Sequence, residues 1–137
     1  MPIPELVAGM MAADAASRTL GIELVTCADG QAVTRMTVRD DMVNGYDMAH
    51  GGVVFSVADT AFACACNSFG EQTVAAGAEV VFVAPARRGD VLVAEAAVRT
   101  AFGRSGVYDV TVRREADRAV VAEFRGRSHR VHRAPGS

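Results

Sequence analysis

One stretch of the chain, residues 51–69, is apolar nearly all round. Its nineteen residues include a single charged side chain, Asp59, and a helix over this range would be about 28 Å long. Gly70 follows and suits the position after a helix end, because glycine readily adopts the left-handed conformation that closes a helix. A helix without a polar face is typically buried on every side, so we expect this one to run through the middle of the fold.

The remaining segments alternate between apolar and polar side chains, as half-buried β-strands do. Turns rich in glycine or proline separate them, and Ala28-Asp29-Gly30 is typical of a tight hairpin. The predicted strands cover residues 22–26, 31–39, 73–84, 91–100, 107–113 and 119–130. A short amphipathic helix is expected over about residues 4–20, and residues 134–137 are expected to be frayed.

The 73–84 segment stands apart because it is almost continuously apolar. This indicates a strand that is covered on both faces or one that lies at a subunit contact. An antiparallel sheet of about six strands can curl around one apolar helix and bury it. With 137 residues, the chain has the size of one domain. The pattern therefore predicts a single α+β domain over residues 1–137, with the hotdog arrangement of a sheet wrapped around one long central helix.

Composition excludes several classes of protein. A net charge of −2 argues against a nucleic-acid-binding domain, which is usually basic. Three cysteines without a framework spacing favour a reducing cytosol. The N-terminus has no signal-peptide pattern, and His50, Asp59 and Asn67 argue against a membrane span at 51–69. We expect a cytoplasmic protein without a bound metal, because no cluster of metal-ligating residues is visible.

Candidate chemistry gathers at the start of the central helix. Gly51 and Gly52 offer backbone N–H groups that have no partner in the first helical turn, and glycine lets a ligand approach closely. Together with the helix dipole, these amides suit a carbonyl whose oxygen gains negative charge during attack. Asp59 can activate water or attack the carbonyl itself, and the polar residues Asn44 and His50 lie just before the helix. These are the parts of an acyl-transfer site.

The spacing of these groups predicts a dimer. Gly51 and Asp59 are eight residues apart, which is about 12 Å along one helix. Reacting groups lie about 3–3.5 Å from their target, so these two cannot easily act on one carbonyl within a single chain. A shared site would take Gly51 from one chain and Asp59 from its neighbour, which predicts a two-fold dimer with two such sites.

Each residue also has a structural interpretation. Asp59 can be a buried acid bonded to the backbone or to Asn67, and His50 can cap the helix or orient the loop before it. The paired glycines can mark close packing, and Asn44 next to Gly45 is ordinary turn chemistry.

The wider pattern resembles a known family. The central stretch carries Asn44-Gly45, His50-Gly51-Gly52, Phe55 and Ala58-Asp59, and the likeness continues through residues 65–68, 106–109 and 124–130. Over about residues 20–132 the chain is similar to hotdog acyl-CoA thioesterases of the phenylacetate-degradation (PaaI) type. The matches outside the central stretch point to the phenylacetate clade itself.

The resemblance implies an enzyme that hydrolyses acyl-CoA thioesters, with phenylacetyl-CoA and its ring-hydroxylated forms as favoured substrates. Asp59 would be the nucleophile or general base, and the Gly51 amide would polarise the thioester carbonyl. Asn44 would place the thioester or the water, and His50 would support the loop. Coenzyme A would be part of the substrate, and no separate cofactor is implied. Such enzymes are dimers of dimers, or homotetramers, with sites at subunit interfaces.

The resemblance also suggests substrate-binding residues. Arginine suits CoA phosphates, and the candidates at turns and strand ends are Arg87, Arg88, Arg104 and Arg127. Near the helix start, Gly52, Phe55, Tyr46 and Met48 are the candidates for binding the thioester and the acyl group. One departure is visible. Related aryl-CoA thioesterases with a glutamate in place of Asp59 have a threonine one helical turn later that holds water, and Ala63 stands at that position here.

Two other functions fit the same fold. A hotdog hydratase or dehydratase would use His50 and Asp59 as its proton-handling pair and would release no free CoA. A non-enzymatic acyl-CoA-binding protein would show binding without turnover, and the fold alone does not distinguish it from an enzyme.

Overall fold

The structure is a computed structural model that describes residues 2–131, so the predicted frayed tail at 134–137 lies outside the described residues. Three α-helices, one short 3-10 helix and six strands follow one another within residues 2–131. In chain order they are α1 (Glu5–Ala13), α2 (Ala15–Leu20), β1 (Glu23–Ala28), β2 (Gln31–Thr37), η1 (Asp40–Met42), α3 (Gly51–Asn67), β3 (Thr73–Phe82), β4 (Val91–Phe102), β5 (Ser105–Arg114) and β6 (Val120–Arg130).

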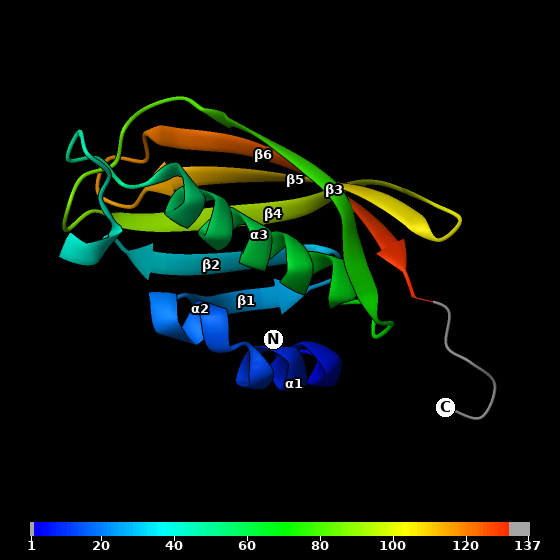
Figure 1. Cartoon of the computed structure of the whole chain (residues 1–137). Helices are drawn as coiled ribbons and strands as arrows, with labels where there is room; N and C mark the ends of the chain where they lie inside the picture. Colours follow the sequence, from blue (N-terminus) through cyan, green and yellow to red (C-terminus); the bar gives the residue numbers. More distant parts are fainter. Residues whose placement is uncertain (1, 132–137) are drawn as a thin grey trace.

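The six strands form one antiparallel sheet in the order β1-β2-β4-β5-β6-β3. The helix α3 lies across one face of this sheet, as Figure 1 shows. This confirms the predicted α+β hotdog fold with six strands. The hairpin turn at Asp29 and Gly30 also forms where it was predicted, and both residues have positive φ angles of 53° and 78°.

The prediction that α3 is buried on every side is wrong for the single chain. The side that packs on the sheet is closed, and Val57, Ala61 and Cys64 have no exposed surface. A stripe on the other side keeps partial exposure, and it consists of Gly52, Phe55, Ser56, Asp59 and Ala63. These positions recur at helical spacing. One sheet covers only one side of a helix, so the stripe is left open.

The apolar strand β3 was predicted either to be covered on both faces or to lie at a subunit contact, and the first alternative is wrong within the chain. It pairs only with β6 and forms one edge of the sheet, and most of its residues are exposed. Val81 is 62% exposed and Phe82 54%. The strand is therefore not covered on both faces within the chain, and its outer edge presents unpaired backbone groups. A subunit contact along this edge stays a prediction.

The helix expected over residues 4–20 is divided at Asp14. This residue has the non-helical angles φ −80° and ψ 86°, and its carboxylate accepts a hydrogen bond from the Ser17 amide at 2.9 Å, which caps α2. Aspartate favours such capping over the helix interior. The Ser17 hydroxyl also lies 2.9 Å from that of Thr60, so α2 is tied to the middle of α3.

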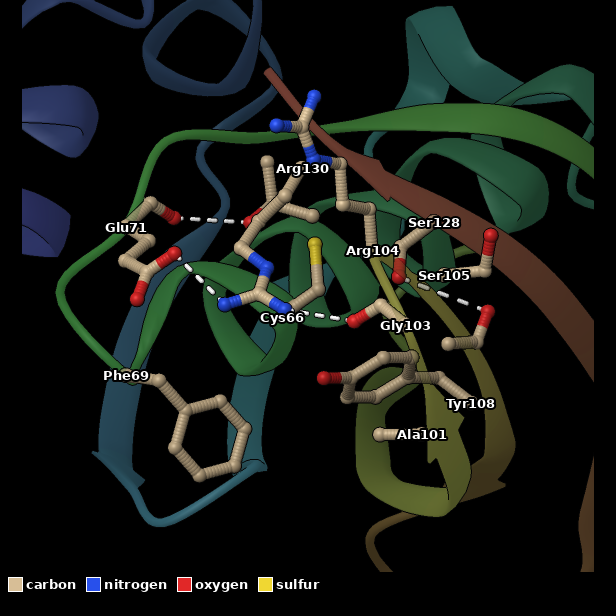
Figure 2. Close-up of a pocket in the computed structure, with 12 residues that line it drawn as sticks. Cys66, Phe69, Glu71, Ala101, Gly103, Arg104, Ser105, Tyr108, Ser128 and Arg130 are labelled. Carbon is tan, nitrogen blue, oxygen red and sulfur yellow. Dashed lines mark hydrogen bonds and ion pairs between the residues drawn. The ribbon is translucent and has the colours of Figure 1, made fainter. Parts of the chain in front are cut away.

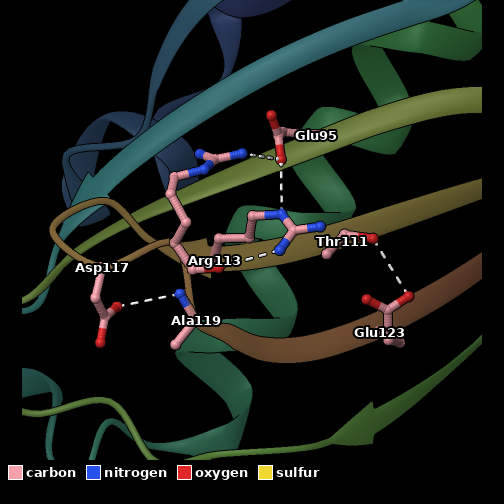
Figure 3. Close-up of polar contacts among 7 residues, drawn as sticks. Glu95, Thr111, Arg113, Asp117, Ala119 and Glu123 are labelled. Atoms are coloured by element: carbon pink, nitrogen blue, oxygen red, sulfur yellow. Dashed lines mark hydrogen bonds and ion pairs between the residues drawn. The ribbon is translucent and has the colours of Figure 1, made fainter.

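The sheet turns apolar side chains toward α3 and charged ones away from it. Val110 and Val112 of β5 are fully buried, whereas their neighbours Thr111 and Arg113 join polar contacts on the outer face (Figure 3). Glu95 there accepts hydrogen bonds from Arg113 at 3.2 Å and Arg118 at 2.8 Å. Among the helices formed by residues 2–131, none combines the length and apolar character that a membrane crossing requires.

Candidate active site

The loop before α3 is folded around the side chain of Asn44. Its Oδ1 atom accepts hydrogen bonds from the backbone amides of Tyr46 at 2.9 Å and Met48 at 3.1 Å. The backbone amide of Asn44 donates to the Met48 carbonyl at 2.7 Å. The side-chain oxygen of Asn44 therefore stabilises the turn, as the structural interpretation of this residue proposed. Its side-chain nitrogen donates no hydrogen bond within residues 2–131, so the group remains available to a ligand.

His50 is the N-cap of α3. Its Nδ1 atom accepts a hydrogen bond from the Gly52 amide at 3.0 Å, and its backbone amide donates to the Met42 carbonyl at 2.8 Å. The side chain thus caps the helix, as its structural interpretation proposed. Because the cap occupies the Gly52 amide, Gly51 is the glycine whose N–H has no acceptor in the described part of the chain.

A cavity of about 350 Å³ lies beside this helix start. Asn44, Met48 and Gly51 line it together, so the structure unites three of the predicted site residues. The other lining residues come from the loop before α3, the start of α3, the segment at and after the end of β3, and the start of β6. They are Ala49, Val54, Phe82, Val83, Ala84, Pro85, Ala86 and Val121. The space is mainly apolar, with polar groups only at its helix end.

Two predicted acyl-binding residues lie elsewhere. The Tyr46 side chain is 83% exposed. Phe55 packs against Phe124 of β6, with the ring centroids 5.3 Å apart. Neither lines the cavity at Gly51, and Phe55 belongs to the open stripe of α3 instead.

Asp59 lies on the open stripe, about 12 Å along α3 from Gly51. Partial burial raises the pKa of its carboxyl, and the negative charge of Asp14 raises this pKa further. The carboxylate forms no hydrogen bond and no ion pair within residues 2–131. A raised pKa and the lack of a partner in the described chain make this carboxyl a candidate for a base or nucleophile.

The structural alternative, a bond from Asp59 to Asn67, is absent among these residues. Asn67 instead joins the end of α3 to the start of β3. Its nitrogen donates to the Ala63 carbonyl at 2.8 Å and the Thr73 carbonyl at 3.0 Å, while its oxygen accepts from the Thr73 amide at 2.9 Å. The amide group is fully used there.

The four arginines predicted for CoA phosphates do not gather at one place. Arg87 and Arg88 follow the segment that lines the cavity at Gly51, and Arg88 pairs with Asp47 at 2.7 Å. Arg104 lies in the β4–β5 turn, where it lines a second cavity. Arg127 lies on β6 with its guanidinium over the backbone of Gly77. Only the first two are near the helix start.

Sequence reasoning missed two groups near the site. The ring of Phe82 stands beside Gly51, where a Cβ atom would be 3.0 Å from its Cζ atom. Asp14, which acts electrostatically on Asp59, is 45 residues away along the chain. The apolar pattern of β3 does not reveal that its last residue closes the cavity, and a capping aspartate carries no local signal of its distant neighbour.

Comparison with known proteins places the chain in a family. The model of the thioesterase superfamily matches residues 46–121. The chain is 45% identical over 118 residues to the acyl-coenzyme A thioesterase PaaI of Escherichia coli, which covers 86% of the chain and 84% of that protein.

Two solved structures agree. The E. coli PaaI protein from the phenylacetic acid degradation operon superposes with a TM-score of 0.88 at 43% identity, covering 91% of this chain and 90% of that one. A mutant of the phenylacetic acid degradation protein PaaI from Thermus thermophilus gives 0.82 at 32% identity, covering 86% and 100%. The chain therefore belongs to the thioesterase superfamily, within which it is a hotdog-fold thioesterase of the PaaI type.

Proposed function

We propose that this enzyme hydrolyses acyl-CoA thioesters to the free acid and CoA, and that phenylacetyl-CoA and its ring-hydroxylated forms are its substrates in phenylacetate degradation. The observation that carries the proposal is the half-buried carboxylate of Asp59. It has no hydrogen-bond partner in the described chain, and it shares a helix with the unoccupied Gly51 amide. The similarity to PaaI over most of the chain supports the substrate class.

In the proposed reaction the thioester carbonyl accepts a hydrogen bond from the Gly51 amide, which stabilises the negative charge that develops on its oxygen. Asp59 acts as an ionised carboxylate, either by taking a proton from water or by attacking the carbonyl carbon. If Asp59 takes a proton from water, the resulting hydroxide bonds to the carbonyl carbon, the carbon–sulfur bond breaks, and the proton held by Asp59 passes to the CoA thiolate. If Asp59 attacks the carbon itself, the carbon–sulfur bond breaks to leave a mixed anhydride, which water then hydrolyses to the free acid and a proton for the thiolate. The chemistry requires no metal or other cofactor, because CoA arrives as part of the substrate.

The remaining site residues have supporting roles in this proposal. The free nitrogen of Asn44 orients the thioester or the water, and His50 holds the loop by capping α3. Met48 lies beside the thioester in the cavity. Arg87 and Arg88 lie near the same cavity and would contact the CoA phosphates at its opening to solvent. Arg88 would keep its ion pair with Asp47.

We propose further that the active unit is a homodimer with two shared sites, and that two dimers form a tetramer in the cytoplasm. Two surfaces support the dimer. The edge of β3 exposes Val74, Val81 and Phe82, and a second β3 can pair with it in antiparallel orientation about a two-fold axis. The open stripe of α3 leaves Asp59 partly exposed, so a neighbouring chain can bring its own Gly51 to it.

Release of free CoA thiol from phenylacetyl-CoA, hydroxyphenylacetyl-CoA and a straight-chain acyl-CoA tests the reaction. Wild type is compared with Asp59→Asn and with Asp29→Asn, a matched control in the β1–β2 turn whose φ of 53° asparagine tolerates. Fast release from the aryl substrates, lost only in Asp59→Asn, supports the proposal. Conversion of enoyl or 3-hydroxyacyl thioesters without CoA release would point to the hydratase, and binding that survives Asp59→Asn without wild-type turnover would point to a binding protein.

The shared site has its own test. Two inactive variants, Gly51→Pro and Asp59→Asn, are unfolded, mixed and refolded together. A mixed dimer contains one site in which both groups are intact, so turnover should reappear. If mixed dimers form and stay inactive, the two groups do not serve one site across the interface.

A further inference from the structure

A second cavity, of about 250 Å³, opens at the opposite end of α3 from Gly51. Figure 2 shows it between the last turn of α3, the β4–β5 hairpin and the end of β6. Its lining residues are Cys66, Phe69, Glu71, Thr73, Ala101, Gly103, Arg104, Ser105, Gly106, Tyr108, Ser128 and Arg130. The proposed reaction as described so far uses none of these residues, and Arg104 is the one among them that was predicted to bind substrate.

The cavity lies on the same side of α3 as Asp59. Cys66 follows Asp59 by seven residues, which is nearly two full turns and about 10.5 Å along the axis. The two side chains are close enough that the charge of Asp59 contributes to the pKa of the Cys66 thiol, which burial raises to about 12. Between them on the open stripe stands Ala63, whose small side chain leaves the helix surface low.

Two hydroxyls of buried residues face the cavity without strong partners. Tyr108 is 3% exposed and its ring packs on Phe62 at a centroid distance of 5.6 Å, but its hydroxyl forms no hydrogen bond within residues 2–131. In Figure 2 this hydroxyl points into the space beside Phe69 and Cys66. Ser128 is 4% exposed, and its hydroxyl reaches only the Gly106 carbonyl at 3.5 Å.

Within residues 2–131 no enclosed side-chain nitrogen or oxygen atom lacks a hydrogen-bond partner, so the unpaired Tyr108 hydroxyl opens to the cavity. A ligand in the cavity can supply its partner. Burial raises the pKa of the Tyr108 hydroxyl, so it stays protonated and can donate as well as accept. Phe69 lies across the cavity from Tyr108 and Ala101 lies beside it, and both are apolar. This combination fits a ring that carries a hydroxyl group.

The arginines of this cavity do not by themselves make it an anion-binding site. Arg130 is held by the Glu71 carboxylate at 2.7 Å and by the Gly103 carbonyl at 2.6 Å. The negative charge of Glu71 offsets the positive charge of the Arg130 guanidinium. Together the two side chains fix the β4–β5 hairpin against the segment after α3. Arg104 stands at the rim beside them.

The segments that extend the resemblance beyond the central motif meet at this cavity. Cys66 comes from residues 65–68, Gly106 and Tyr108 from 106–109, and Ser128 and Arg130 from 124–130. These segments are far apart in the chain, and the fold brings all three to one place.

We propose that this cavity receives the far end of the acyl group and that Tyr108 is the residue that recognises a ring hydroxyl there. This proposal rests on the proposed function, since it places the thioester carbonyl at Asp59 and the acyl group along Ala63 toward Cys66. Ser128 contributes a second hydrogen bond. Arg104 then belongs to the acyl end of the site, and the CoA phosphates are left to Arg87 and Arg88.

Tyr108→Phe tests the proposal, because it removes the hydroxyl and keeps the ring that packs on Phe62. The quantity measured is the ratio of kcat/KM for 4-hydroxyphenylacetyl-CoA to that for phenylacetyl-CoA. Loss of one hydrogen bond should lower this ratio about three- to tenfold. The matched control is Thr111→Val on the same strand, which removes a hydroxyl from the outer face (Figure 3) and should leave both the ratio and the activity unchanged.

Ser128→Ala guards against a folding failure of Tyr108→Phe, and it should lower the same ratio. An active wild-type enzyme whose ratio is unchanged in both variants would overturn this proposal and leave the thioesterase function standing. A folded wild type that hydrolyses no thioester would instead overturn the proposed function and this proposal with it.

Discussion

The Nδ1 atom of His50 accepts a hydrogen bond from the Gly52 amide at 3.0 Å, and this bond separates the roles of two neighbouring glycines. A helix start has several amides without intrahelical partners. Here the histidine cap uses one of them, and Gly51 lines the cavity together with Asn44 and Met48. Of the two glycine amides, only that of Gly51 is therefore open to a substrate carbonyl.

The first prediction isolates that amide with two substitutions. Gly51→Pro removes the N–H, while Gly51→Ala keeps it, and both add a Cβ atom about 3.0 Å from the Phe82 ring. Proline suits the first helical position, and the ψ of 137° at His50 is one that a following proline allows. An oxyanion donor contributes about 100- to 1000-fold to turnover. The kcat for CoA release should therefore be about 100- to 1000-fold lower in Gly51→Pro than in Gly51→Ala. Equal losses would mean that the side chain, not the amide, matters.

The second prediction concerns the cap itself. His50→Ala leaves the Gly52 amide without its acceptor, so the free energy of unfolding should fall by about 1 kcal/mol. His50→Asn supplies a side-chain oxygen in the capping position and should recover most of that loss. Urea denaturation of wild type and both variants measures the free energy of unfolding. If alanine and asparagine behaved alike, the 3.0 Å contact would contribute little to stability.

Much of the fold could be predicted from periodicity. The helix at α3 and the strands of the sheet follow from the spacing of apolar residues, because each element buries one face or stripe. What the pattern could not give is how many sides of α3 one chain covers. The residues Gly52, Asp59 and Ala63 lie among apolar neighbours in the sequence, yet they form an open stripe because the sheet reaches only the other side.

The site was predictable where its residues are close in the chain. Asn44, Met48 and Gly51 meet at one cavity because a single loop carries them into the helix. The cavity around Tyr108 was not predicted, since it joins segments from distant strands and turns. Hydrophobic alternation marked Tyr108 only as one side of a strand, and no local signal shows that its hydroxyl lacks a partner.

The third prediction follows from the raised pKa of Asp59. Ionised Asp59 places a half-buried charge in the folded chain, a cost that the unfolded chain does not bear. As the pH falls through the folded pKa toward the unfolded value of about 3.9, the folded state binds the proton first and gains stability. Asp59→Asn should therefore melt at a higher temperature than wild type at neutral pH, although we expect it to release no CoA.

The advantage of this variant should shrink as the pH falls toward about 4. Thermal melts of the two proteins at several pH values measure the difference. A melting-temperature difference independent of pH would show that the charge of Asp59 is not the cause. In wild type, turnover should decline in the same pH window, because only the ionised carboxylate can act as base or nucleophile.

The last prediction separates a glycine that serves packing from those that serve chemistry. Gly126 lies on β6 opposite Phe62 of α3, and a Cβ atom there would stand 2.7 Å from the ring. Phe62 is 1% exposed and cannot move aside freely. Gly126→Ala should therefore lower the free energy of unfolding by about 1–3 kcal/mol through overpacking. Gly9→Ala is the control, since nothing lies within 4 Å of its Cβ position in α1, and it should be neutral or slightly stabilising.

A second substitution tests the cause of that loss. Phe62→Leu makes room for the new methyl group, although alone it lowers stability because it leaves a gap in the core. In the double variant the two losses should not add, and the coupling measured by urea denaturation should reach about 0.5–3 kcal/mol. Additive losses would mean that Gly126 is needed for its backbone and not for the space that it leaves. A positive result would explain this glycine of the 124–130 segment by the ring beneath it, with no role in binding substrate.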